Sequence, residues 1–102
     1  SEERPALKLD AIVNANPERL DYRFYLGVAA IGAKHYPESI NALVLVAQDK
    51  NSLYSTPALY YLGVAYAGIK DAPQAKKYLQ DYIAENDDAF RLQAETLLKG
   101  LK

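Results

Sequence analysis

The chain has 102 residues, a length that fits one folded domain, and half of them are apolar and 25% are charged, which excludes a wholly disordered chain. The formal net charge is −1 and no apolar run is long enough to cross a bilayer, so we expect no binding of nucleic acid and no direct membrane insertion. The absence of cysteine excludes disulfides, thiol catalysis and cysteine-ligated metal centres.

Apolar residues at helical spacing predict an all-helical chain. No segment keeps the period-two alternation of a half-buried strand for long. A first helix is expected over residues 5–16, ending near Asn16 and Pro17. Residues 20–33 and 57–69 are apolar around most of the helix circumference, which indicates two helices that are contacted on several sides.

A turn and an amphipathic helix follow each of these two apolar helices. Pro37 and Pro73 lie in the first turns of the amphipathic helices, where a missing amide hydrogen has no intrahelical partner to lose. Asp71 precedes Gln74 at the spacing of a capping box. A last helix is expected over residues 89–101, which brings the expected number of helices to about six.

An internal repeat relates the two helical hairpins. Residues 25–37 read YLGVAAIGAKHYP and residues 61–73 read YLGVAYAGIKDAP, so eight of thirteen positions match at an offset of 36 residues. A repeat of this length indicates stacked units that bury a shared core. We expect a single domain over residues 1–102 that contains a half-repeat helix at 5–16, one repeat at 20–51, a second at 56–87 and a capping helix at 89–101.

Two glycines occupy the same place in the two apolar helices, Gly27 and Gly63. Glycine inside a helix costs about 0.5–1 kcal/mol relative to alanine, so a compensating interaction is expected. The small residues that follow them would also let a neighbouring backbone come near. The sequence therefore predicts a close helix approach at both glycines.

The repeated segment resembles the tetratricopeptide repeat, a helical hairpin of about 34 residues that carries a Leu-Gly pair in its first helix. The matching pairs are Leu26-Gly27 and Leu62-Gly63. The chain departs from the family at the Trp position, which holds Arg23 and Leu59, and at the closing Pro position, which holds Asn51 and Asp87. The resemblance covers about residues 5–87 and implies a right-handed solenoid of two repeats with flanking helices.

In the family that the chain resembles, the first helix of each hairpin lines a concave groove. Here the corresponding residues are mostly apolar or aromatic, and the chain as a whole has nine tyrosines and two phenylalanines. Such side chains are suited to interfaces. The residues expected to bind a partner are Asp21, Phe24, Tyr25, Val28, Ile31, Tyr60, Tyr61, Val64 and Ala67.

These features predict a protein-interaction module, an adaptor or scaffold that takes an apolar helix or extended segment of a protein or peptide into the groove. Family members that bind the acidic C-terminal tails of chaperones use lysine, arginine and asparagine at the groove positions. Phe24, Val28, Tyr60 and Val64 cannot clamp a carboxylate, so no binding of such a tail is expected.

Two other interpretations remain open. The chain can be a structural part of a longer solenoid or of a homo-oligomer, with the groove as a self-association interface. Alternatively, Phe24 and Tyr60 are covered by the terminal helices or by neighbouring hairpins. Cytoplasm and a bacterial envelope are both compatible with the sequence.

No arrangement typical of a catalytic, cofactor or metal site is recognisable. His35 is the only histidine and has no nucleophile or metal ligand near it in sequence. Asp87 and Asp88 are interpreted as caps of the last helix, and Asp81 with Glu85 as a solvated helix face. The sequence therefore predicts a protein that is not an enzyme and needs no cofactor.

Overall fold

A computed structural model describes residues 19–101, and in this part of the chain all regular secondary structure is helical, with no strand. Its helices are α2 (Leu20–Gly32), α3 (Tyr36–Gln48), α4 (Ser55–Gly68), α5 (Ala72–Ala84) and α6 (Arg91–Gly100). The all-helical prediction is confirmed for these residues. The helix expected over residues 5–16 lies outside the described part of the chain.

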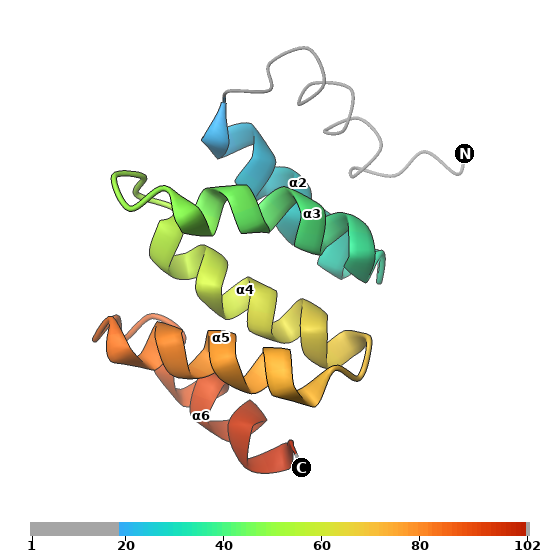
Figure 1. The fold of residues 1–102 in the computed structure, drawn as a ribbon, viewed down its shortest axis with the longest axis vertical. Helices are drawn as coiled ribbons and strands as arrows, with labels where there is room; N and C mark the ends of the chain where they lie inside the picture. Colours follow the sequence, from blue (N-terminus) through green and yellow to red (C-terminus); the bar gives the residue numbers. More distant parts are fainter. Residues whose placement is uncertain (1–18, 102) are drawn as a thin grey trace.

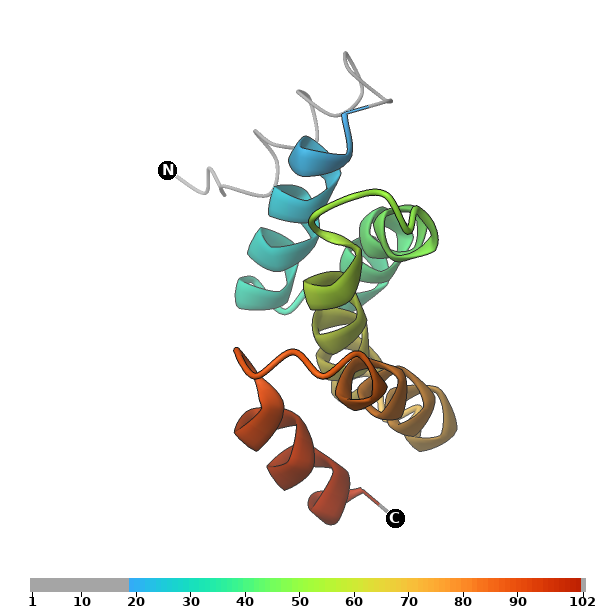
Figure 2. The same ribbon diagram turned by 90° about the vertical axis from the view of Figure 1, so that its left-hand side faces the viewer.

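The helices follow one another along the long axis of the molecule, from α2 to α6 (Figure 1). Each helix packs against the next along the chain, and α2 also contacts α4. Seen from the side, α2 and α6 lie on one side, α3 and α5 on the other, and α4 between them (Figure 2). Among residues 19–101, no helix is both long and apolar enough to span a membrane.

The turns of the two hairpins are built alike. In the first turn, the amide of His35 donates a hydrogen bond to the carbonyl of Ala30 at 2.7 Å. In the second turn, the amide of Asp71 donates the equivalent bond to the carbonyl of Tyr66 at 2.9 Å. Lys34 and Lys70 adopt left-handed backbone conformations with φ values of 62° and 64°. Together these features form a Schellman motif, which satisfies the last carbonyls of α2 and α4.

Both amphipathic helices begin where their prolines predict. Pro37 and Pro73 occupy the first turns of α3 and α5, and the carboxylate of Asp71 accepts a hydrogen bond from the amide of Gln74 at 3.2 Å. The start of α6 differs from the prediction: its N-cap is Phe90, which makes no side-chain cap, and Asp87 instead accepts from the amide of Ala89 at 2.8 Å in the preceding turn.

The repeated glycines lie against repeated leucines. A Cβ atom on Gly27 would stand 2.5 Å from Leu43 Cδ2, and one on Gly63 would stand 2.5 Å from Leu79 Cγ. Both leucines are fully buried. The predicted close approach is therefore confirmed: in each hairpin, a leucine of the second helix packs directly against the backbone of the glycine in the first helix.

Candidate functional site

All nine residues predicted to bind a partner lie on α2 and α4, and these two helices are in contact. None of the nine is fully buried. Tyr25 exposes 45% of its surface, and the other eight are half-buried. Phe24 and Tyr61 connect the two sets directly, with ring centroids 5.8 Å apart.

Several of these side chains belong to a continuous cluster of aromatic rings. Each ring contacts the next with centroids 4.6–5.8 Å apart, within the range of favourable aromatic pairs. The cluster extends from α2 across α4 to the residues before α6. We call it the aromatic cluster, and its members in order of contact are Tyr25, Tyr54, Phe24, Tyr61, Phe90, Tyr60 and Tyr82.

The two central anchors predicted from the sequence are each covered on one side. Tyr60 stacks on Phe90 with centroids 4.6 Å apart and ring planes 8° apart, so the segment before the last helix covers one face of this ring. Phe24 packs at 4.8 Å against Tyr54, which comes from the loop between α3 and α4. Both rings therefore have part of their surface in the domain core and part free.

Sequence reasoning did not assign Tyr54 and Phe90 to this site. Both lie outside the repeated motif, and the helical pattern over residues 89–101 includes Phe90 without showing which rings it contacts. The hydroxyl groups of Tyr25 and Tyr54 are 3.1 Å apart and hydrogen-bonded. This bond is the main cause that raises the pKa of Tyr54 above its usual value, followed by desolvation.

Asp21, the one charged residue of the predicted site, is already paired. Arg19 donates two hydrogen bonds to its carboxylate, at 3.0 and 2.7 Å, and these bonds lower the pKa of Asp21. The Arg19 guanidinium also lies 4.1 Å from the ring centroid of Tyr22. The charge at this end of α2 is thus largely engaged within the molecule.

An apolar groove of about 530 Å³ lies between α4 and α6. Two of its residues, Tyr60 and Val64, belong to the predicted site. Burial is the main cause that raises the pKa of Tyr60. We call this surface the α4–α6 groove, and it is lined by Tyr60, Val64, Leu92, Gln93, Thr96 and Leu97. None of these side chains is charged. The four α6 residues were not predicted, because the sequence identified that helix only as a cap.

A smaller hollow of about 330 Å³ on the side of α3 and α5 has a mixed lining that includes Lys50, Lys77 and Asp81. Lys77 lies 3.5 Å from the carboxylate of Asp81 and 4.5 Å from the centroid of the Tyr78 ring. Its charge is therefore balanced by a carboxylate of the same helix, and Lys50 leaves the lining of the hollow with one net positive charge.

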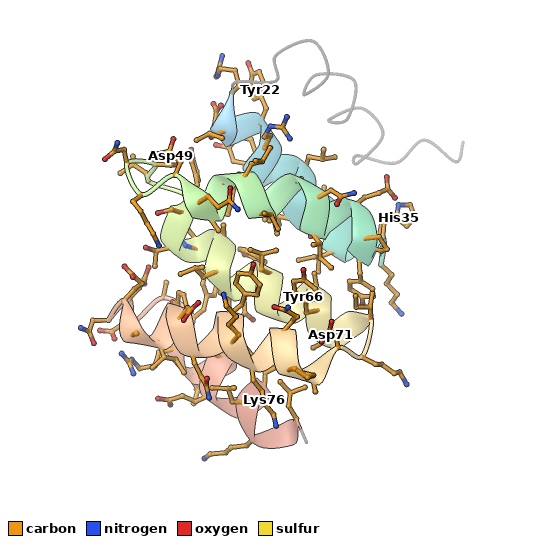
Figure 3. The ribbon with its side chains drawn as sticks, in the orientation of Figure 1. Tyr22, His35, Asp49, Tyr66, Asp71 and Lys76 are labelled. Carbon is orange, nitrogen blue, oxygen red and sulfur yellow. The ribbon has the colours of Figure 1, made fainter. Side chains whose placement is uncertain are left out.

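The polar residues weighed as catalytic candidates are exposed or paired locally, as Asp81 is with Lys77. His35 Nδ1 lies 3.2 Å from Glu38 Oε1 without forming a hydrogen bond, and it stands at the start of α3, at the opposite end of that helix from Asp49 (Figure 3). Asp88 forms an exposed ion pair with Arg91 at 3.4 Å. Within residues 19–101 there is no group of three or more side chains suited to hold a metal ion.

Comparison with protein-family models, with curated proteins and with solved structures finds no significant match for this chain. The candidate site therefore depends on geometry alone. That geometry brings together half-buried aromatic rings on α2 and α4 and an uncharged groove that continues onto α6.

Proposed function

We propose that the chain is a tetratricopeptide-like helical-repeat domain, a right-handed solenoid that binds a segment of a protein partner on the face formed by α2 and α4. Two features that recur at an offset of 36 residues support the repeat assignment: the glycine seated on a buried leucine, and the turn with a left-handed lysine. Repeats of this kind stack into surfaces that are used for binding.

The observation that carries the binding role is the aromatic cluster. Aromatic side chains contribute much of the energy of protein interfaces, and tyrosine is enriched among residues whose truncation weakens binding most. Rings that already contact one another also lose little freedom when a partner covers them. The half-buried Phe24, Tyr60 and Tyr61 meet both conditions, since each contacts at least two other rings.

The chemistry of this face favours a partner segment with apolar or aromatic anchors. Burying a charge without a counter-charge costs on the order of several kcal/mol. The only charged residue of the predicted site is Asp21, and its carboxylate is hydrogen-bonded to Arg19. A terminal carboxylate has no cluster of lysine, arginine or asparagine to meet it here. Acidic chaperone tails are therefore not the ligands of this domain in our proposal, and no cofactor or catalytic step is involved.

An NMR titration with two designed peptides tests this function. One peptide is an amphipathic helix with leucine and tryptophan on one face, and the other is an acidic peptide with a free C-terminal carboxylate. We expect the first to shift the amide signals of α2 and α4 and the second to leave them unchanged. Shifts confined to other helices, or stronger binding of the acidic peptide, would contradict the proposal.

Two variants sharpen the titration. Tyr25→Ala removes an exposed ring of the aromatic cluster and should weaken binding of the apolar peptide by about tenfold. Leu53→Ala truncates an apolar side chain that is 91% exposed in the loop between α3 and α4, outside the aromatic cluster, and it should leave the affinity unchanged.

A further inference from the structure

The α4–α6 groove carries an exposed leucine in its own lining. Leu92 exposes 73% of its surface although it lines the same groove as Val64 and Leu97. The same patch therefore holds a protruding apolar side chain and an apolar hollow. A twofold interface needs such a patch, because each copy must offer the other the same surface.

The groove residues that come from α6 follow the same order from either end of the helix: a leucine, two polar residues and a second leucine. Leu92 and Leu97 stand at the two ends of this set, with Gln93 and Thr96 between them, and all four lie on one face of the helix. A second copy of α6 laid antiparallel on the first would set Leu92 against Leu97 of the second copy. It would also set Gln93 against Thr96, and symmetry would form each contact twice.

The charges next to the groove suit the same arrangement. Asp88 lies just before α6; its side chain is 91% exposed and pairs with Arg91 of its own chain at 3.4 Å, which leaves one carboxylate oxygen for a second cation. Lys99 lies in the last turn of the helix and is also exposed. Antiparallel packing brings Asp88 of each copy to Lys99 of the other. Because the six lining residues carry no charge, the symmetric contact opposes no like charges at its centre.

We propose that this chain forms a twofold homodimer in which the α4–α6 groove of each copy receives α6 of the other. The dimer does not depend on the partner binding proposed above, although it covers Tyr60 and Val64, which belong to both surfaces. A contact centred on one short helix per copy falls at the small end of specific interfaces, so we expect a dissociation constant of roughly 10–100 µM.

Sedimentation velocity of the full chain, from low-micromolar to near-millimolar concentration, tests the dimer. The apparent mass should rise from one copy to two and then stop. Leu92→Lys should keep the chain monomeric, because it places two cations in the shared apolar patch. Leu53→Lys makes the same change at an exposed leucine outside the groove and should dimerise like the parent. A strict monomer, growth beyond two copies, or an equal loss in both variants would overturn the proposal.

A charge exchange tests the antiparallel register. Asp88→Lys and Lys99→Asp should each weaken the dimer at low salt by about threefold to tenfold, because each brings like charges together. The double variant restores opposite charges and should recover most of the parent affinity. A double variant weaker than either single variant would exclude this register. Circular dichroism on every variant distinguishes loss of the dimer from loss of α6.

Discussion

The phenol oxygen of Tyr82 accepts a hydrogen bond from the backbone amide of Phe90 at 2.7 Å. Tyr82 is fully buried on α5, and Phe90 is the N-cap residue of α6. Arg91 strengthens the same junction, because its guanidinium donates to the carbonyl of Ile83 at 3.3 Å. One buried hydroxyl thus fixes the start of the helix that forms half of the α4–α6 groove.

Tyr82→Phe should lower the free energy of unfolding by about 1–2 kcal/mol, because the amide of Phe90 loses its acceptor in a half-buried position. Hydrogen exchange should accelerate most in α6. Tyr78→Phe is the matched control: the Tyr78 ring stacks on Tyr66 at 5.6 Å, and its hydroxyl has no hydrogen bond within residues 19–101. Equal losses of stability in both variants would show that the Tyr82 bond contributes nothing.

Gly27→Ala and Gly63→Ala should each destabilise the fold by about 1–2 kcal/mol, because the new methyl groups would collide with the buried Leu43 and Leu79. The improved helix propensity of alanine offsets only about 0.5–1 kcal/mol of this cost.

Gly32→Ala provides the control within α2. A Cβ atom there meets no heavy atom within 4 Å, so this variant should be more stable than the parent by about 0.5–1 kcal/mol. Urea denaturation of the three variants gives the comparison. A stabilised Gly27→Ala variant would mean that the leucine contact does not require glycine.

The helical hairpins were predictable from the sequence because their signals are local. Pro37 and Pro73 mark helix starts, and the repeated glycines mark a close approach, whatever the rest of the chain does. The positions of Tyr54 and Phe90 in the aromatic cluster were not predictable in this way. These positions depend on how the loops pack against residues that are distant in sequence, and helical periodicity carries no information about such contacts.

The α4–α6 groove was also predictable only in part. Tyr60 and Val64 could be assigned because the repeat fixes which face of α4 they share. The α6 side could not, since the sequence shows that Leu92 and Leu97 are apolar but not how far α6 stands from α4. That separation depends on the junction at Tyr82, which no motif in the chain specifies.

Lys34→Gly and Lys70→Gly should each stabilise the protein by about 1 kcal/mol, because the Cβ atom of lysine is sterically strained in the left-handed conformation and glycine has no Cβ atom. Both lysines are exposed, so little packing is lost. Lys77→Gly, within α5, should instead destabilise by about 1 kcal/mol. Chemical denaturation measures all three variants. A loss at Lys34 or Lys70 as large as that at Lys77 would show that these side chains stabilise the turns.

Stability should fall as the pH rises above about 10, because burial raises the pKa values of Tyr60, Tyr66 and Tyr82. In the unfolded chain these phenols lose their protons near pH 10, whereas the folded state retains them, so folding binds protons in this range. The stabilisation is fully present below the unfolded pKa and is lost as the pH rises through the folded values. Urea midpoints measured across this range, with tyrosinate absorbance as the probe of ionisation, test the sign. Tyr60→Phe should reduce the pH dependence, and a midpoint that rises with pH would contradict the prediction.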